Sequence, residues 1–232
     1  MDNIVFLSPT ISLFDKNLKS YEDMLYTIDY ARATCTNRPL RQSDKQREIL
    51  VKEIAKIGHH SLFEHVYFSF SMVISRAMLA QLTRHRLASY SVESQRWCNY
   101  EVYACFIYPV QYGILETPLT FGQLLRKTLE MDRNRAERVK VFAKNCKSSY
   151  LQYLELLELG AKPEEARYVL NNAFAVHLLM TCNLRELMWI LRLRSKPNVF
   201  PEFKYVVKLI KKELKNKYPV FAEVIENEDV SD

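Results

Sequence analysis

The stretch Arg84-His85-Arg86-Leu87-Ala88-Ser89-Tyr90-Ser91-Val92-Glu93-Ser94-Gln95-Arg96 organises this chain. It begins with three cationic or potentially cationic side chains and ends with another arginine. Residues 76–83, just upstream, carry apolar side chains at helical spacing, so we expect the cluster to lie where a helix ends and irregular chain begins. An anionic ligand would compensate this charge, because arginine presents a planar fork of donors to phosphate. A solvated basic helix end, stabilised by the helix dipole, is the alternative.

The chain has 232 residues and a formal net charge of +6. This length suits one domain with a sizeable core, and the charge is compatible with phosphate ligands without requiring nucleic acid. We predict a single globular domain over residues 1–220 and an acidic tail over 221–232 that frays. The lysine-rich residues 204–217 have the spacing of a helix with one solvated face.

The cysteines and histidines indicate the cellular compartment and whether a metal site is expected. The five cysteines form an odd count without a CxxC pair, and the sequence shows neither a secretory segment nor an apolar run of transmembrane length. We therefore expect a cytoplasmic protein with reduced thiols. The histidines at 59, 60 and 65 lack the spacing of a metal site, so we expect no metal.

Hydrophobic periodicity predicts both helices and strands. We expect strands over residues 3–7, 66–74 and 173–180, a β-prone aromatic segment over 97–108, and helices over 21–32, 43–57, 76–83, 121–159, 183–194 and 204–217. Ser43 can cap the second of these helices, and Gly58 can end it. The long stretch 121–159 is half polar, which fits packing on another subunit or exposure to solvent. The mixture without regular βαβ spacing predicts an α+β fold.

Several blocks along the chain share one resemblance. The first is the Arg84–Arg96 stretch, which reads RHR, then seven residues, a serine, one residue and an arginine. The block Gly58–His65 precedes it, and the blocks Ala166–Leu170 and Asn183–Leu187 follow it. Gln81 and Arg194 also stand at matching positions. These blocks resemble the flavin-dependent thymidylate synthases (the ThyX family). The matches come in order from about residue 58 to 194, so the resemblance covers most of the chain.

The resemblance implies a fold and two sets of site residues. The fold would be α+β, a mixed or antiparallel sheet packed by long helices, assembled as a homotetramer with active sites between subunits. Substrate dUMP would be held by Gln81, Arg84, Ser94, Gln95, Arg96, Arg167 and Arg194. The catalytic residue would be Arg194, which would stabilise the anion formed when the uracil ring is activated. FAD would be bound by His59, Ser61, Glu64, Arg84, His85, Arg86, Asn183, Arg185 and Trp189.

The resemblance also implies the reaction. The enzyme would make dTMP from dUMP, with 5,10-methylenetetrahydrofolate as carbon donor and NADPH-reduced FAD as hydride source. Ser94 would bind substrate and not act as a nucleophile, because no persuasive base is near it in sequence. The chain contains no glycine-rich dinucleotide loop, which argues against a Rossmann flavin site.

The sequence departs from the family pattern mainly on the flavin side. Val92 stands at a polar position, Trp189 replaces a polar residue, and Asn198 and Phe200 interrupt the segment after Arg194. Trp189 either stacks on the flavin or crowds it out. A divergent member that binds nucleotide as a sensor or partner subunit is therefore one alternative. A basic RNA-binding protein is another, although the aromatic platforms that single strands stack on are sparse here.

Overall fold

The computed structural model describes residues 3–16 and 18–228. Contacts within the chain divide it into two compact units. Unit 1 comprises Met1–Thr10, Val73–Leu82 and Ser91–Leu178, and unit 2 comprises Ile11–Met72, Thr83–Tyr90 and Leu179–Asp232. The sequence predicts one domain over residues 1–220, since no linker or shift in composition marks a boundary. The division into two units is hidden in the sequence because the chain passes from unit to unit several times.

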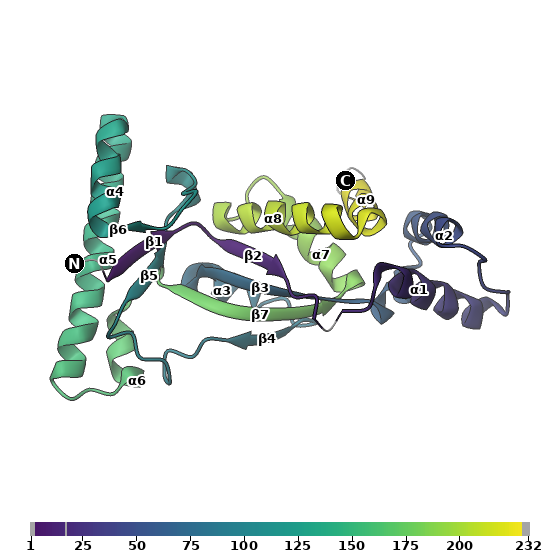
Figure 1. Cartoon of the computed structure of the whole chain (residues 1–232), viewed down its shortest axis with the longest axis horizontal. Helices are drawn as coiled ribbons and strands as arrows, with labels where there is room; N and C mark the ends of the chain where they lie inside the picture. The colour runs from purple at the N-terminus through teal and green to yellow at the C-terminus, as the bar shows by residue number, and fades with distance from the viewer. Residues whose placement is uncertain (1–2, 17, 229–232) are drawn as a thin grey trace. The chain divides into compact units, whose positions relative to one another are not determined.

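The elements are those of an α+β protein, and Figure 1 labels them. The strands are β1 (Ile4–Leu7), β2 (Thr10–Leu13), β3 (Tyr67–Ser75), β4 (Ser89–Val92), β5 (Ala104–Ile107), β6 (Leu119–Thr120) and β7 (Ala175–Asn183). The α-helices are α1 (Tyr21–Thr36), α2 (Asp44–Lys56), α3 (Arg76–Leu82), α4 (Phe121–Lys127), α5 (Arg133–Glu158), α6 (Pro163–Ala166), α7 (Leu184–Ser195), α8 (Pro201–Lys217) and α9 (Pro219–Glu228). The 3₁₀ segments are η1 (His60–His65), η2 (Val110–Tyr112), η3 (Thr128–Glu130) and η4 (Arg167–Val169).

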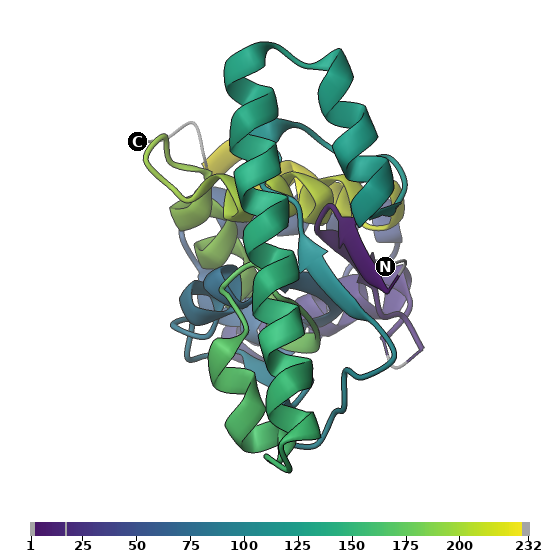
Figure 2. The same cartoon turned by 90° about the vertical axis from the view of Figure 1, so that its left-hand side faces the viewer.

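Unit 1 is built on a small mixed sheet in the order β5-β1-β6. Strand β1 runs parallel to β5 and antiparallel to β6. Helix α5 lies across one face of this sheet with α4 beside it (Figure 2), and the rings of Phe6 and Phe142 meet there at 5.9 Å. Val139, Cys146 and Tyr153 put the apolar stripe of α5 into this core, which follows from their helical spacing.

The long helix predicted over 121–159 is divided in the structure. Helix α4 and turn η3 end before Met131, and α5 starts afresh at Arg133. The Asp132 side chain accepts a hydrogen bond from the Arg135 backbone N–H at 2.9 Å. An aspartate in this position satisfies an orphan donor of a new helix, and this local bond outweighs the continuous periodicity.

The second sheet has the order β2-β3-β7-β4. Within β3, Phe68, Phe70 and Met72 are buried, as the predicted alternation requires. The segment after α3 was expected to be irregular, but Ser89–Val92 forms β4. The expectation of irregular chain is wrong there because the pairing partner, β7, lies far along the sequence.

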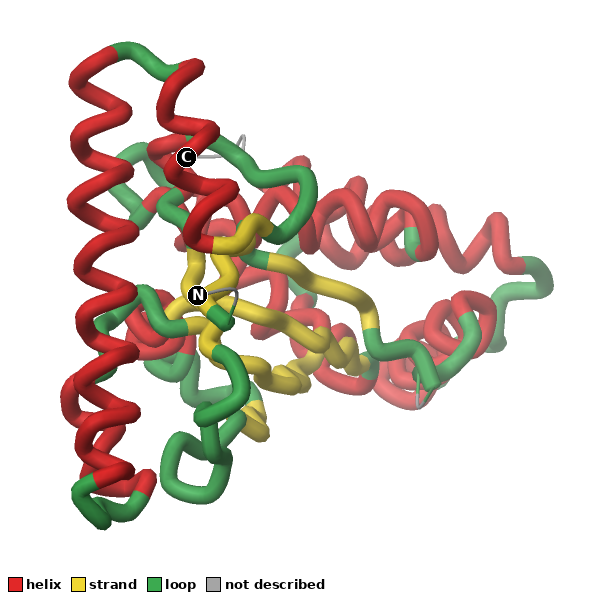
Figure 3. The backbone as a smooth tube through the Cα atoms, turned by 60° about the vertical axis from the view of Figure 1, so that its left-hand side comes forward, coloured by secondary structure: helices red, strands yellow, loops and turns green. Residues whose placement is uncertain are grey.

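Among the described residues, side chains cap the starts of three helices in unit 2. Ser20 caps α1, Ser43 caps α2 and Asn183 caps α7, and each side chain accepts a backbone N–H of the first turn. Figures 1 and 3 show α1 and α2 side by side, joined at one end by a loop. The cap predicted at Ser43 and the helix start predicted at Asn183 are confirmed.

The predicted frayed tail from residue 221 is instead helix α9 as far as Glu228, and residues 229–232 lie outside the described residues. Phe221, Val224 and Ile225 are buried. The frayed tail was predicted because acidic residues are frequent in this segment, but its apolar side chains share one helix face and are buried together. Glu223, on the other side, pairs with Lys52 at 2.6 Å.

Among the described residues, no helix combines the length and apolar character that crossing a membrane requires. The same residues contain no group of three or more His, Cys, Asp or Glu side chains arranged to hold a metal ion.

Candidate functional site

The RHR cluster follows α3, and its middle residue points inward. His85 is only 5% exposed, whereas Arg84 and Arg86 on either side are exposed. The backbone carbonyl of His85 accepts a hydrogen bond from the Tyr90 hydroxyl at 3.0 Å. The turn therefore presents two arginines to solvent and buries the histidine between them.

The His85 ring joins the RHR cluster to the C-terminal end of α7. The Nε–H of Arg194 donates to His85 Nε2 at 3.1 Å, although the two residues are 109 positions apart. On the other side of the ring, Nδ1 lies 3.7 Å from Glu186 Oε1. An Nε2 that accepts a hydrogen bond leaves the ring proton on Nδ1, facing Glu186.

Burial sets the charges in this cluster. It lowers the pKa of His85 to about 4, with the Arg194 charge as a second cause. Burial also raises the pKa of Glu186 and lowers that of Arg194. The Arg194 guanidinium lies over the Phe203 ring, 4.7 Å from its centroid, which holds the side chain by a cation–π contact. At neutral pH the cluster therefore holds a neutral histidine between a cation and a carboxyl group.

The His85 contribution to stability should depend on pH. Its folded pKa of about 4 is below its ordinary 6.5, so the unfolded chain takes up the proton more readily. This contribution to the free energy of unfolding is complete above pH 6.5 and is lost as the pH falls toward 4. The loss amounts to about 3 kcal/mol, because each pKa unit corresponds to about 1.36 kcal/mol. The raised pKa of Glu186 acts in the opposite direction, so the measurement must isolate His85.

Comparing the unaltered protein with the His85→Gln variant isolates the contribution of His85 to the pH dependence of stability. The glutamine does not titrate, and every other group is common to both proteins. We expect the difference in free energy of unfolding between the two proteins, from urea titrations, to shrink as the pH drops from 6.5 to 4. A difference that stays constant over this range would show that His85 is not held neutral.

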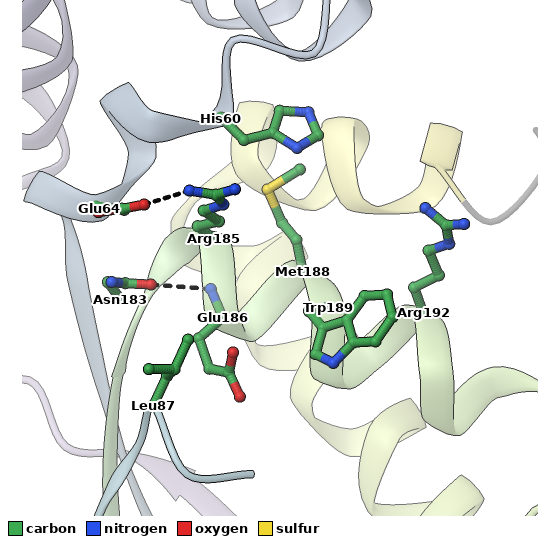
Figure 4. Close-up of a pocket in the computed structure, with 9 residues that line it drawn as sticks. All are labelled: His60, Glu64, Leu87, Asn183, Arg185, Glu186, Met188, Trp189 and Arg192. Atoms are coloured by element: carbon green, nitrogen blue, oxygen red, sulfur yellow. Dashed lines mark hydrogen bonds and ion pairs between the residues drawn. The ribbon is translucent and has the colours of Figure 1, made fainter.

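A pocket of about 740 Å³ opens beside this cluster in unit 2. Its lining residues are His60, Glu64, Leu87, Asn183, Arg185, Glu186, Met188, Trp189 and Arg192. Figure 4 shows the side chains of Arg185, Met188 and Trp189 projecting from α7, with His60 close to Met188. The pocket combines one side of α7 with η1, which belongs to the Gly58–His65 block.

Four of the predicted FAD residues meet in this pocket: Glu64, Asn183, Arg185 and Trp189. The Glu64 carboxylate pairs with the Arg185 guanidinium across 121 positions of sequence. Asn183 is committed to capping, since its Oδ1 accepts the Glu186 N–H at 2.9 Å. The Trp189 indole is 51% exposed and lies in the pocket lining.

This donor set fits a flavin dinucleotide. Two guanidinium groups, those of Arg185 and Arg192, and the N-terminus of α7 suit a pyrophosphate. Glu64 can accept hydroxyl or amino donors, and Trp189 offers a ring face for stacking. The volume lies in the range of small-molecule pockets.

The other predicted FAD residues lie outside this lining. His59 immediately precedes η1 without a side-chain cap and borders a different pocket, and Ser61 is exposed on η1. Arg84 and Arg86 are exposed on the turn after α3. His85 faces Arg194 and Glu186, so its ring acts on these two residues.

The predicted dUMP residues are divided between the units. Arg84 and Arg194 belong to unit 2, and the other members, which belong to unit 1, are Gln81, Ser94, Gln95, Arg96 and Arg167. In unit 1 Arg96 pairs with Glu164 of α6 at 2.6 Å, and Arg167 opens the turn that follows α6. The structure thus links the Arg96 segment to the Arg167 segment.

Ser94 and Gln95 have environments suited to binding. The Ser94 hydroxyl oxygen accepts the Arg96 N–H at 3.3 Å, while the Glu93 carboxylate accepts from the Tyr100 hydroxyl at 2.7 Å and the His177 N–H at 3.1 Å. Glu93 is therefore engaged elsewhere and does not serve Ser94 as a base. Gln95 is buried, and its Nε2 has no hydrogen-bond partner in the described part of the chain, which leaves a donor for a ligand.

Sequence reasoning missed five pocket residues: His60, Leu87, Glu186, Met188 and Arg192. Glu186 belongs to the Asn183–Leu187 block, and its place three residues after a capping asparagine was the available signal. Met188 is buried on α7, as its helical spacing with Leu184, Leu187 and Leu191 allows, yet it also borders the pocket. Leu87 gave no signal, because an exposed leucine after a turn has no chemistry of its own.

Comparison with known proteins gives one consistent result. The model of the thymidylate synthase complementing protein family matches residues 17–220. A flavin-dependent thymidylate synthase of Haloarcula marismortui is 32% identical over 162 residues, covering 66% of this chain and 64% of that protein. The same enzyme of Thermotoga neapolitana is 32% identical over 183 residues, covering 79% of this chain and 77% of the relative. The chain thus spans somewhat less than two thirds of the first relative's length.

A solved structure shares the fold. The crystal structure of a UMP/dUMP methylase PolB from Streptomyces cacaoi, bound with 5-Br dUMP, superimposes with a TM-score of 0.75. The two chains are 24% identical, and the match covers 96% of this chain and 97% of the other. At this identity the similarity establishes the α+β fold.

Proposed function

This chain belongs to the thymidylate synthase complementing protein family, that of the flavin-dependent thymidylate synthases, and from this premise we propose that it converts dUMP to dTMP. The carbon donor is 5,10-methylenetetrahydrofolate, and NADPH-reduced FAD is the hydride source. The protein is a cytoplasmic homotetramer in this proposal, with active sites shared between subunits.

The observation that carries this proposal is the pocket on α7. Glu64, Asn183 and Arg185 were expected around FAD from two separate sequence blocks, and Trp189 from its position near the flavin; all four border one cavity. Reduced flavin, when bound, supplies the hydride. The protein contributes the anion-binding arginines, the indole face and the start of α7.

Arg194 carries the electrostatic part of the proposal. Its guanidinium is fixed by the His85 hydrogen bond and by the Phe203 ring. A positive charge held in one place stabilises the negative charge that develops on the uracil ring, without reorganisation at the moment of reaction. His85 and Glu186 act as positioning residues, because together they keep an acceptor lone pair on the nitrogen that faces Arg194.

On the nucleotide side, Ser94, Gln95, Arg96 and Arg167 hold dUMP. Arg96 stacks over Trp97 at 5.6 Å as well as pairing with Glu164. A phosphate competes with Glu164 for the Arg96 fork, and an exposed ion pair of this kind is weak enough to exchange. Gln81, from α3 in the same unit, supplies an amide for the uracil edge.

One observation favours the second candidate, a family member that binds nucleotide without turnover. Trp189 lines the pocket, where it either supports the isoalloxazine or excludes it. In addition, Val92, half-buried in β4, stands where the family has a polar residue, so the Arg84–Arg96 stretch has one hydrogen-bonding side chain fewer.

The visible absorbance spectrum separates the two candidates. Protein mixed with FAD and desalted should retain flavin absorbance, and added dUMP should perturb the flavin band. Arg185→Gln should weaken FAD binding at least about tenfold, since a charge-assisted hydrogen bond to phosphate is lost. The matched control is Arg133→Gln, on the exposed first residue of α5.

The possible outcomes are distinct. Retained flavin that ignores dUMP would count against the nucleotide side of the proposal. A protein that stays colourless with added FAD, yet binds dUMP, would replace the synthase with the second candidate. Loss of FAD binding in Arg133→Gln as well would show that charge in general, and not the α7 pocket, governs binding.

A further inference from the structure

The segment proposed to hold dUMP in unit 1 lies in a short loop whose two ends are joined by a hydrogen bond. Strand β4 ends one residue before Glu93, and Ser94, Gln95 and Arg96 come directly after it. The Tyr100 hydroxyl donates to Glu93 Oε1 at 2.7 Å, and the two residues are seven positions apart. The Glu93–Tyr100 pair therefore closes the loop that carries the proposed dUMP residues.

The Glu93 end of this loop is held near the start of β7. The Glu93 backbone N–H donates to the His177 carbonyl at 2.8 Å, and Glu93 Oε2 accepts the His177 backbone N–H at 3.1 Å. The carboxylate thus takes the place of a backbone acceptor in a pair of strand-like hydrogen bonds. Main chain and side chain of one residue together hold this end of the loop to a segment 84 positions away.

The Tyr100 end of the loop is held in the core of unit 1. Tyr100 is 8% exposed, and its ring meets that of Phe174 at 4.8 Å. Two hydroxyl groups of α5 hold its backbone, since that of Tyr150 donates to the Tyr100 carbonyl at 2.7 Å and that of Tyr153 accepts the Tyr100 N–H at 3.4 Å. Burial, followed by the hydrogen bond to Glu93, raises the pKa of the Tyr100 phenol, so the hydroxyl remains a donor at neutral pH.

Between its two ends the loop makes a compact turn. The backbone N–H groups of Trp97 and Cys98 donate to the Ser94 carbonyl at 3.1 and 2.9 Å. The Ser94 hydroxyl oxygen accepts the Arg96 N–H at 3.3 Å. These local bonds fix the shape of the turn, whereas its place on unit 1 depends on what the two ends contact.

We propose that Glu93 is a positioning residue, which holds Ser94 and Arg96 in the arrangement that binds dUMP before the nucleotide arrives. This inference rests on the proposed function. Glu93 does not touch the nucleotide itself, because both carboxylate oxygens already accept protein donors and a carboxylate repels a phosphate. A loop that is already in place spares the conformational entropy that a mobile loop would lose on binding. Arg194 supplies the charge for the chemical step, so loss of Glu93 should weaken dUMP binding and leave kcat nearly unchanged.

Substitutions at the pair test this role through KM and kcat for dTMP formation and through Kd for dUMP from isothermal titration calorimetry. Glu93→Ala should raise KM and Kd about tenfold and leave kcat within about twofold, because two hydrogen bonds to a carboxylate are lost. Tyr100→Phe, which removes one of these bonds, should raise both constants about fivefold. Glu93→Gln should stay within about twofold of the unaltered protein, since its amide can accept the His177 N–H and donate to the Tyr100 oxygen. A glutamine variant as weak as the alanine variant would overturn the proposal.

Tyr108→Phe is the matched control for Tyr100→Phe. It removes a phenol hydroxyl of the same unit that donates to the Tyr112 carbonyl at 3.1 Å, outside the loop. Its Kd for dUMP should equal that of the unaltered protein. Equal weakening in the two tyrosine variants would show general destabilisation and overturn the proposal. A lower kcat with unchanged KM in Glu93→Ala would do the same.

Hydrogen exchange measured by mass spectrometry tests the loop without any ligand. The N–H groups of Trp97 and Cys98 should be protected in the unaltered protein and should exchange at least about tenfold faster in Glu93→Ala. Equal exchange in the two proteins would overturn the proposal. If the unaltered protein neither binds dUMP nor forms dTMP, the proposed function fails and this inference fails with it. If Glu93→Ala binds dUMP as tightly as the unaltered protein, this inference alone fails.

Discussion

Replacing Arg194 by alanine is expected to lower kcat for dTMP formation by about 10²–10³-fold, the cost typical of removing one preorganised charge donor from a developing anion. The geometry explains why the loss should be this large. The guanidinium is held on one side by His85 Nε2 at 3.1 Å and on its face by Phe203 at 4.7 Å, so its position is fixed before substrate binds. The measurement is steady-state dTMP formation with saturating FAD and NADPH.

Arg194→Lys is the informative companion variant. Lysine keeps the charge, but it lacks the Nε–H that meets His85 and the planar fork that stacks on Phe203. We therefore expect it to recover little of the lost rate. Both variants should keep their circular dichroism spectra. Full activity of Arg194→Ala, or full rescue by lysine, would show that a fixed guanidinium is not what accelerates the reaction.

Replacing Phe221 by alanine is expected to reduce the free energy of unfolding by about 3–5 kcal/mol, the usual cost of emptying a buried phenylalanine site. The Phe221 side chain is fully buried. Its ring meets those of Tyr21 at 5.8 Å, Phe68 at 5.9 Å and Tyr218 at 6.3 Å. These partners come from α1, β3 and the residue before α9, so the cavity would border several elements of unit 2. Urea titration provides the measurement.

Tyr168→Ala is the control, because that aromatic side chain is 84% exposed on η4. We expect its free energy of unfolding to stay within about 0.5 kcal/mol of the unaltered protein, as is usual for surface positions. Similar small effects of both substitutions would mean that α9 is not part of the folded core. That result would restore the frayed tail that composition suggested.

Much of the local structure could be predicted from the sequence. The starts of α2 and α7 followed from Ser43 and Asn183, since a capping side chain and its N–H partner are three residues apart. The buried face of β3 followed from period-two alternation, and the stripe of α7 from helical spacing. Each of these signals is contained within a few residues. The division at Asp132 was also local, but periodicity concealed it.

The candidate site could be predicted in part. The sequence blocks identified Glu64, Asn183 and Arg185, and a departure from the family pattern identified Trp189. The fold brings these four to one pocket. The blocks also predict His85 at the flavin site, and in the structure its ring nitrogens face Arg194 and Glu186. A motif records which residue types recur together, and it does not record which of them turn inward.

The sequence by itself determined the family, the α+β class and the chemistry of the site residues, because these depend on residue identity and short-range spacing. The tertiary structure alone decided that His85 is a neutral, buried partner of Arg194, that Ser89–Val92 pairs as a strand, and that the Glu93 carboxylate meets the His177 backbone N–H. These features depend on contacts between residues tens of positions apart. Burial and long-range hydrogen bonds set them, and neither quantity exists until the chain has folded.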